Sequence, residues 1–437
     1  MARMTNVTCC PAVSPDLCRL KMLLKMQRLE LLAPAGAFDS LTAAIDAGAD
    51  AVYFGVEQLN MRARSANNFT LDDLPEVSRL CQAAGVRSYI TLNTVLYDHD
   101  LPMMRRIVAA AAEHQIDAVI AMEPGVMQYA REQGVDVHLS TQANITNVEA
   151  VKFYAQFAEV MVLSRELTLS QVAYISRAVE QQNICGPSGK PVQIEAFVHG
   201  ALCMAVSGKC YLSLHTHNSS ANRGACKQNC RRTYTVKDEE GRELLIDNEY
   251  IMSPKDLNTI GFLDKLVEAG VGVFKIEGRS KGPEYVYEVT RCYREALDAI
   301  QDGTFSSAKV DAWMERLEQV YNRGFWGGYY LGQKMGEWTD APGSVAKERK
   351  VFLGTGIKYF SGIGIGEFKL QSGGLRLGDE VIITGPTTGY LRTKVTSLHL
   401  EEQPVEAINR RGVHFSMPVG EKIRPSDKLY KVEPNTN

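Results

Sequence analysis

The sequence of 437 residues lacks the features that most directly identify membrane proteins, nucleotide-binding folds and common hydrolases. It has no run of about 18 apolar residues, so no membrane-spanning helix is expected. It has neither of the glycine-rich loops, G-x-G-x-x-G and G-x-x-x-x-G-K-[ST], that hold dinucleotides and nucleotide phosphates. It also has no H-E-x-x-H and no G-x-S-x-G, so a zinc-peptidase helix and a nucleophile elbow are both absent.

A strong net charge is missing as well. The chain has 48 Lys+Arg and 51 Asp+Glu, a net charge of −3, so no overall basic field indicates nucleic acid. Residues 345–437 differ from the rest, since they hold 14 basic and 10 acidic residues and are therefore +4. A basic terminal part on an acidic body is a modest indication of RNA contact, and an ordinary solvated surface is the alternative.

The first 28 residues have no continuous apolar segment, so they are not expected to be a signal peptide. They are interpreted as a disordered or mis-assigned amino terminus. The chain has ten cysteines, and without a secretory signal they indicate a reducing compartment. The expected localisation is cytoplasmic.

Short apolar runs recur from Leu29 onward, and most are followed by an amphipathic helical pattern. Strands buried on both faces of a parallel sheet have such nearly continuous apolar runs. Eight βα units over residues 29–302 predict an α/β fold, a (β/α)8 TIM-like barrel; a doubly wound open sheet is the alternative. The eight predicted strands are Leu29–Leu32, Ala51–Phe54, Ser88–Leu92, Ala118–Ala121, Val137–Leu139, Val160–Leu163, Ile194–Val198 and Val273–Ile276.

Nearly every predicted strand ends in a polar or charged residue. Active sites of such barrels lie at the carboxyl ends of the strands, so these side chains are expected to converge. A single Glu or His there would more often be a satisfied structural group, but a convergent set favours a site. The candidates are Asn93, Glu123, Gln142, Arg165, Glu166, His199, Glu277 and Arg279, with Lys275 one step inside the last strand.

Four cysteines follow the seventh predicted strand in an insertion at about residues 200–255. Cys203, Cys210, Cys226 and Cys230 have the spacing C-x6-C-x15-C-x3-C. Thiolates are ligands for zinc and for iron–sulfur clusters, and the irregular spacing suits a cluster somewhat better. Ordinary buried cysteines are the alternative. The insertion is expected to lie over the barrel mouth.

The remaining chain is predicted as helices Asp256–Ala269 and Glu284–Ile300, a connector at 303–346, and a small all-β barrel domain at 347–437. A hairpin is expected to turn at Glu240-Gly241. The connector holds a helix near Val310–Tyr321 and a Gly/aromatic run, 324–330, that either stacks on RNA bases or packs the joint.

Several stretches resemble the collagenase-like, U-type peptidase family, over about residues 29–430. The matching motifs are Glu195-x-Phe197-x-x-Gly200-Ala201-Leu202-Cys203, Gly208-x-Cys210-x-Leu212-Ser213, Leu32–Gly36, Gly48–Tyr53, Leu163–Glu166 and Phe274–Arg279.

Despite the family's name, the resemblance implies an RNA-modifying hydroxylase. Well-understood members hydroxylate a tRNA wobble uridine, a ribosomal RNA cytidine or a ubiquinone precursor, and need a four-cysteine iron–sulfur cluster. The chain is most similar to the tRNA enzymes that form 5-hydroxyuridine with prephenate as hydroxyl donor. The resemblance therefore implies a 4Fe-4S cluster on the four cysteines, with zinc as the alternative. It implies tRNA as partner, with rRNA or a protein substrate as alternatives, no membrane, and the possibility of a paralogous partner subunit.

Roles for the strand-end residues are expected from this. Arg165 and Arg279 would bind the donor's carboxylates, because a guanidinium binds a carboxylate through two hydrogen bonds. Glu166 and Glu277 would orient these arginines, and His199 would shuttle protons. Lys275, Asn93, Gln142 and Glu123 are the further substrate-binding candidates. A peptidase with a Cys203–His199 pair is the competing hypothesis, although it would take Cys203 away from a cluster.

Overall fold

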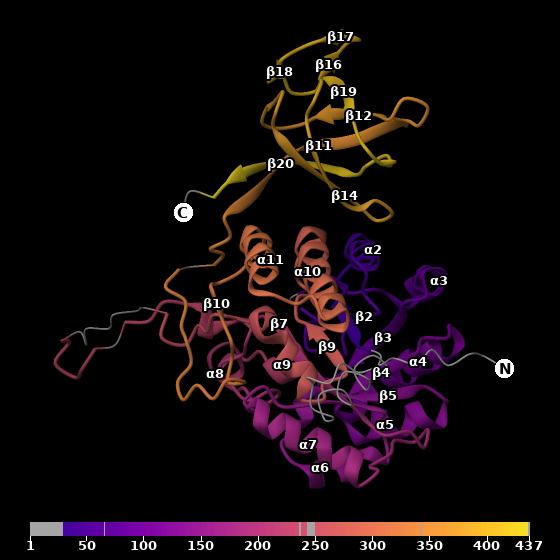
Figure 1. The fold of residues 1–437 in the computed structure, drawn as a ribbon, viewed down its shortest axis with the longest axis vertical. Helices are drawn as coiled ribbons and strands as arrows, with labels where there is room; N and C mark the ends of the chain where they lie inside the picture. The colour runs from indigo at the N-terminus through magenta and orange to yellow at the C-terminus, as the bar shows by residue number, and fades with distance from the viewer. Residues whose placement is uncertain (1–28, 65, 236, 243–249, 342, 436–437) are drawn as a thin grey trace, which may run out of the picture.

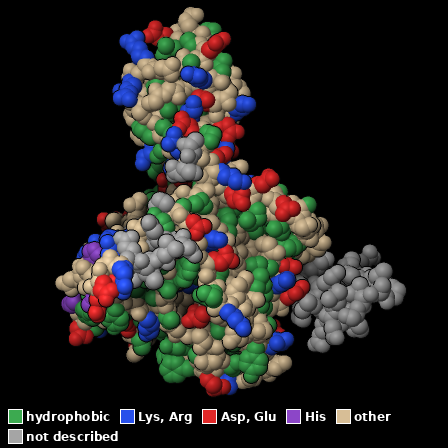
Figure 2. Space-filling view, turned by 90° about the vertical axis from the view of Figure 1, so that its left-hand side faces the viewer, with side chains coloured by type: hydrophobic (Ala, Val, Ile, Leu, Met, Phe, Trp, Pro, Cys, Tyr) green, Lys and Arg blue, Asp and Glu red, His purple; other side chains and the backbone are tan. Residues whose placement is uncertain are grey.

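The computed structural model describes residues 29–64, 66–235, 237–242, 250–341 and 343–435. A large barrel body carries a smaller all-β domain, joined through a narrow waist (Figures 1 and 2). The first 28 residues, interpreted above as a disordered or mis-assigned terminus, lie outside the described residues. Within the described part, no helix is both long enough and apolar enough to span a membrane.

Eight parallel strands form a closed barrel, which confirms the (β/α)8 prediction. Pairing follows chain order from β1 to β7, and β9 then pairs with both β7 and β1. No open edge remains among these eight strands, so the open-sheet alternative is wrong. The strands are β1 (Glu30–Pro34), β2 (Ala51–Gly55), β3 (Arg87–Leu92), β4 (Ala118–Ala121), β5 (Asp136–Leu139), β6 (Val160–Val162), β7 (Gln193–Gly200) and β9 (Val273–Ile276).

Amphipathic helices surround the barrel and bury their apolar faces against it. Their ends follow local sequence signals: Thr168 and Gln171 form a reciprocal capping box before α7, and Gly85 ends α3 with φ +68°. The helices are α2 (Phe38–Asp46), α3 (Leu74–Ala84), α4 (Leu101–Glu113), α5 (Pro124–Glu132), α6 (Val148–Ala155), α7 (Leu169–Gln181), α9 (Leu263–Glu268) and α10 (Pro283–Gln301).

The barrel interior contains paired charges as well as apolar side chains. Lys275 on β9 donates to Glu195 on β7 at 2.7 Å, and both residues are buried. Near the other end, Glu30 accepts from the hydroxyl of Tyr89 at 2.7 Å and pairs with Arg87. Buried charges are tolerated when they are paired in this way, and removing one partner typically costs about 3–5 kcal/mol.

The helix predicted at Asp256–Ala269 is shorter than expected. Its first residues form β8 (Asp256–Asn258), which is antiparallel to the end of β7 and pairs with β10 (Phe325–Trp326). The backbone N–H of Thr259 donates to Val198 at 3.1 Å, which fixes this stretch against β7. The helix therefore begins only at α9.

The connector packs against the barrel body. Helix α11 (Ser307–Gln319) lies on α10, where Trp313 donates to Glu295 at 2.9 Å. In the Gly/aromatic run, Trp326 and Tyr330 are buried, and the Tyr330 hydroxyl donates to a backbone carbonyl of β7 at 2.9 Å. Packing, rather than RNA stacking, is therefore the role of these two rings.

Two elements near the cysteines complete the body. Helix α8 (Leu212–His217) is a short helix of six residues within the insertion. The expected hairpin turn is present, since the N–H of Gly241 donates to Asp238 at 3.0 Å. Residues 243–249, which would form its returning arm, lie outside the described residues.

The terminal domain is all-β, as predicted, and its antiparallel strands enclose one apolar core. The strands are β11 (Glu348–Phe360), β12 (Ile365–Leu370), β13 (Leu375–Arg376), β14 (Glu380–Gly385), β15 (Gly389–Lys394), β16 (His399–Leu400), β17 (Gln403–Pro404), β18 (Ala407–Ile408), β19 (His414–Pro418) and β20 (Lys428–Pro434).

This domain docks on the outer helices α2 and α10 of the barrel body (Figure 1). The rings of Tyr390 and Tyr287 lie 5.0 Å apart, and Tyr390 shares a small apolar cluster with Ala43. Lys350 pairs with Glu284 at 2.8 Å beside them. The described terminal domain contributes no residue to the pocket considered next.

Candidate functional site

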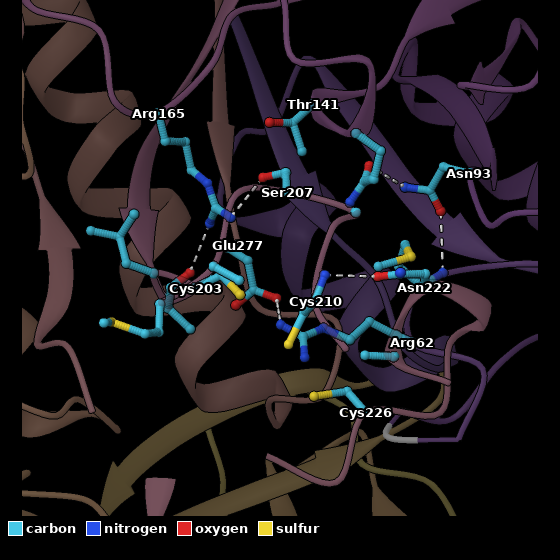
Figure 3. Close-up of a pocket in the computed structure, with 18 of the residues that line it drawn as sticks. Arg62, Asn93, Thr141, Arg165, Cys203, Ser207, Cys210, Asn222, Cys226 and Glu277 are labelled. Carbon is cyan, nitrogen blue, oxygen red and sulfur yellow. Dashed lines mark hydrogen bonds and ion pairs between the residues drawn. The ribbon is translucent and has the colours of Figure 1, made fainter. Parts of the chain in front are cut away.

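A cavity of about 420 Å³ lies at the carboxyl ends of the barrel strands. Its floor comes from the barrel, and its roof comes from residues 201–235, called the cysteine segment below. Figure 3 shows side chains from both parts pointing into the same space. Of the predicted strand-end residues, the structure brings six together here: Asn93, Gln142, Arg165, Lys275, Glu277 and Arg279.

Cations dominate the described lining. Glu277 is the single acidic residue in it, and a site with one sign of charge attracts anions. Glu277 is itself paired, and two of the cations have acidic partners elsewhere. The eight cationic lining residues are Arg62, Arg165, Lys209, Arg231, Lys275, Arg279, Lys281 and Arg323.

Arg165 and Arg279 both reach the pocket, as predicted, but neutral groups hold them. Arg165 donates to Ser207 at 3.0 Å and to the Ala201 carbonyl at 3.3 Å, both in the cysteine segment. Arg279 donates to Thr91 at 2.8 Å and is buried. Burial lowers the pKa of Arg279 to about 10, which leaves it cationic at neutral pH. In the described chain neither guanidinium has an acidic partner, so their charge is available to a ligand.

Glu277 does not orient Arg279, contrary to the prediction. Its carboxylate pairs instead with Arg62, from the loop after β2, at 2.6 Å. Burial alone would raise the pKa of Glu277, but Arg62, followed by Lys281 and Arg165, brings it below its usual value. Glu277 is therefore an ionised, neutralised group, unsuited to act as an acid near neutral pH.

Lys281 is a pocket residue that the strand-end pattern missed. Its ammonium lies over the ring of Tyr321, 2.9 Å from the centroid. Burial, together with the charge of Arg323, lowers the pKa of Lys281 to about 8, although Glu277 and Asp256 oppose this. Lys281 is thus a cation that loses its charge just above physiological pH.

The prediction that His199 shuttles protons in the site is wrong. Side chains of β7 alternate between the barrel interior and the outer helices, and Glu195 and Phe197 face the interior. Regular alternation would make His199 face the interior as well. A β-bulge between Phe197 and His199 shifts the register against β9. His199 therefore faces the outer helices, where its Nδ1 lies 3.3 Å from the Tyr293 hydroxyl. Burial lowers the pKa of His199 to about 3, so its ring is neutral at physiological pH.

Two predicted acidic residues also lie away from the cavity. Glu166 is exposed and does not line it, so it cannot orient Arg165. Glu123 precedes α5, where its carboxylate accepts from the backbone N–H of Leu96 at 3.3 Å. Both follow their strands in sequence, but neither side chain lines the cavity.

All four predicted cysteines line the cavity. Figure 3 shows Cys203, Cys210 and Cys226 on one side of it, beside the Arg62–Glu277 pair. Burial raises the pKa of the Cys230 thiol, Arg231 opposes this, and the other three cysteines raise it further. The backbone N–H of Gln228 donates to the Cys226 sulfur at 3.4 Å, a contact that would stabilise a thiolate.

The four thiols suit a cluster better than a single metal ion. Among the described residues, no three His, Cys, Asp or Glu side chains are placed to hold a metal ion. Four soft sulfur donors around one cavity fit an iron–sulfur cluster better, because its core is larger than one ion. Of the other described cysteines, Cys81 and Cys292 are buried in the core and Cys185 lies elsewhere on the body.

Contacts with the barrel hold the cysteine segment in place. Arg223 pairs with Asp100 at 2.6 Å, and Arg231 donates to the Ser253 hydroxyl, just before β8, at 3.0 Å. Within the segment itself, the Asn222 side chain accepts from the backbone N–H of Cys210 at 3.2 Å. These polar anchors replace the apolar core that the segment lacks.

Residues 36–340 match the model of a family described as Peptidase family U32. A Porphyromonas gingivalis protein named "Collagenase" is 58% identical over 405 residues, covering 92% of this chain and 98% of that protein. A 23S rRNA 5-hydroxycytidine synthase of Escherichia coli is 36% identical, covering 69% of this chain and 45% of that protein. A tRNA hydroxylation protein of Bacillus subtilis is 29% identical, covering 92% of this chain and 94% of that protein.

The position of His199 leads to a stability prediction. Its folded pKa of about 3 lies below the unfolded value of about 6.5, so the unfolded chain binds more protons between these values. The wild-type free energy of unfolding should therefore fall as the pH is lowered from 6.5 to 5, with His199 contributing on the order of 2 kcal/mol. Chemical unfolding of a His199→Phe variant should show a correspondingly weaker pH dependence.

His215→Gln is the matched control, because His215 is exposed. It should leave the wild-type pH dependence unchanged. Identical pH dependence in wild type and His199→Phe would contradict the assignment of His199 as a buried neutral group.

Proposed function

The chain belongs to peptidase family U32, and from this premise we propose that it is an enzyme that hydroxylates a pyrimidine base in RNA. One observation carries the proposal: a cation-lined cavity at the barrel mouth contains four cysteines and no histidine among its described residues. Such a cavity suits anions and a sulfur-ligated centre rather than peptide hydrolysis.

The specific substrate we propose is the wobble uridine of tRNA, giving 5-hydroxyuridine. Relatives named for tRNA hydroxylation and for rRNA 5-hydroxycytidine synthesis support the chemistry. Coverage favours the tRNA type, because this chain spans 94% of the Bacillus tRNA relative but 45% of the rRNA relative. The reaction needs the base to enter the pocket. An unpaired loop base can do so without being extruded from a duplex.

We propose that Cys203, Cys210, Cys226 and Cys230 hold a 4Fe-4S cluster. When bound, it would supply redox or Lewis-acid chemistry at the roof of the cavity. The chain's own contribution is to hold the sulfurs over the floor, through the anchors of Arg223 on Asp100 and Arg231 on Ser253.

We further propose prephenate, a dicarboxylate, as the hydroxyl donor. Arg165 and Arg279 would pair with its carboxylates, because both guanidiniums line the cavity without acidic partners in the described chain. Lys281 would add a third charge. The neutral amides of Asn93 and Gln142, 3.3 Å apart, suit the hydrogen-bonding edge of a uracil base.

A peptidase is the second candidate, because the relative at 58% identity is named "Collagenase". The thiol mechanism considered above needs Cys203 next to His199. His199 instead lies on the outer face of β7 against Tyr293, so this pair is not formed.

The function is tested by nucleoside mass spectrometry of tRNA and rRNA from cells with and without this gene. We expect 5-hydroxyuridine in tRNA to disappear with the gene and to return with the wild-type copy. Loss of hydroxycytidine from rRNA alone would contradict the tRNA assignment. Cleavage of denatured collagen that survives repurification and disappears with Cys203→Ala would favour the peptidase instead.

The cluster is tested by metal analysis. Anaerobically purified protein should contain iron and sulfide with broad visible absorption, and Cys→Ala at position 203, 210, 226 or 230 should abolish the absorption. Cys185→Ala is the control and should retain it, because Cys185 lies outside the cavity. Colourless protein with stoichiometric zinc would contradict the cluster while leaving the four-ligand site.

Lys281 predicts a pH dependence for donor binding. Prephenate affinity should fall roughly tenfold as the pH rises through about 8, because Lys281 loses its charge there. Lys281→Arg should keep its affinity to higher pH, since a guanidinium remains cationic. Calorimetric titration between pH 6.5 and 9.5 checks this. Arg323, Glu277 and Asp256 are the charged groups near Lys281. If wild type and Lys281→Arg show the same pH profile, the change in affinity does not come from Lys281.

A further inference from the structure

The cysteine segment has an unusual charge composition. Residues 201–235 contain five Lys or Arg residues and no Asp or Glu. Two of the five, Arg223 and Arg231, are the structural anchors described above. The other three, Lys209, Lys227 and Arg232, are exposed and have no acidic partner in the described chain. Their charge is therefore directed to solvent.

A fourth exposed cation lies against this segment. The backbone N–H of Arg64 donates to the Gly224 carbonyl at 3.3 Å. Gly224 has φ +81°, and a Cβ there would lie 2.3 Å from the Asn60 carbonyl, so the two loops are in tight contact. Arg64 is exposed and adds a cation from the loop after β2 to those of the cysteine segment. Arg64, Lys209, Lys227 and Arg232 are called the basic rim below.

Two aromatic side chains are exposed on or against the cysteine segment. Tyr211 is 68% exposed and lines the cavity, next in sequence to Cys210. Tyr97 is 54% exposed, and the guanidinium of Arg223 lies 4.0 Å from its ring centroid. Cations interleaved with exposed rings are typical of surfaces that bind single-stranded nucleic acid, because phosphates meet the charges and bases stack on the rings.

The surroundings limit where a polyanion can lie. Acidic residues Asp238, Glu239 and Glu240 follow the cysteine segment at the hairpin turn and would repel phosphates on that side. Figure 2 shows basic, acidic and histidine side chains close together at the left edge of the barrel body, apart from the terminal domain. That domain, although basic overall, docks on α2 and α10 and contributes nothing to the described cavity lining.

We propose that the basic rim, with Tyr211, docks the single-stranded loop of the RNA substrate, and that the terminal domain is not the primary RNA-binding surface. The proposal rests on the proposed function and names its recognition surface. Phosphates of the loop would lie along the rim cations. A base next to the modified one would stack on Tyr211 at the cavity entrance.

The test compares two triple variants with the same charge change. Lys209→Gln/Lys227→Gln/Arg232→Gln alters the rim. Lys369→Gln/Arg410→Gln/Arg411→Gln alters exposed cations of the terminal domain and is the control. Anaerobic full-length proteins of equal melting temperature and iron content are titrated with a tRNA anticodon stem-loop at several salt concentrations.

We expect the rim variant to bind at least tenfold more weakly. Its slope of log K against log salt should be about 2 smaller in magnitude, since each lost phosphate contact on a single strand removes about 0.7. The control should stay within about twofold of wild type. Tyr211→Ala should weaken binding about tenfold with the salt slope unchanged, because stacking releases no counterions.

The failures of the two proposals are distinguishable. If the wild type hydroxylates tRNA but the control variant, and not the rim variant, loses affinity, the rim proposal is overturned and the function stands. If the wild type neither binds nor modifies RNA while the rim variant loses affinity for denatured collagen, a protein substrate replaces RNA and both proposals fail.

Discussion

The pairing of β7 with β9 is the constraint on which the site depends. These strands are neighbours in the closed barrel, yet 72 residues, 201–272, separate them in sequence. The chain leaves β7 at its carboxyl end. Because β9 is parallel to β7, the chain must cross to the other end of the barrel before it enters β9 at its amino end. The cysteine segment, as the first part of this excursion, therefore begins over the mouth. The buried pair of Lys275 and Glu195 joins the same two strands from inside.

Sequence patterns predicted the barrel well because strand burial leaves a strong signal. Every one of the eight apolar runs became a strand, since strands covered by helices outside and packed inside must be apolar on most positions. The strand-end residues Arg165 and Arg279 were found for the same reason, as parallel strands end at one face. The failure at His199 has a specific cause: a bulge reverses the alternation after Phe197, and a bulge leaves no reliable signal in one sequence.

The pocket residues that the sequence did not reveal come from loops. Arg62 and Arg323 reach the cavity from segments with no periodic pattern, and only the folded chain brings them to Glu277 and Asp256. Lys281 lies two residues beyond Arg279, the last of the predicted strand-end residues. Much of the site's electrostatics is therefore a tertiary property. Arg62 pairs with Glu277, the single acid in the described lining, Lys275 and Arg323 pair with acids outside it, and the remaining lining cations have no acidic partner in the described structure.

The absence of acids from the cysteine segment serves two requirements at once. A carboxylate close to the thiols would raise their pKa and oppose the thiolate form that binds iron, whereas Arg231 favours the thiolate of Cys230. A carboxylate at the same place would also repel RNA phosphates approaching the cavity. In the function proposed here, both demands fall on one stretch of chain, because the roof of the pocket is also its entrance. The polar anchors Arg223 and Arg231 then hold the segment on the barrel body through Asp100 and Ser253, which lie outside it.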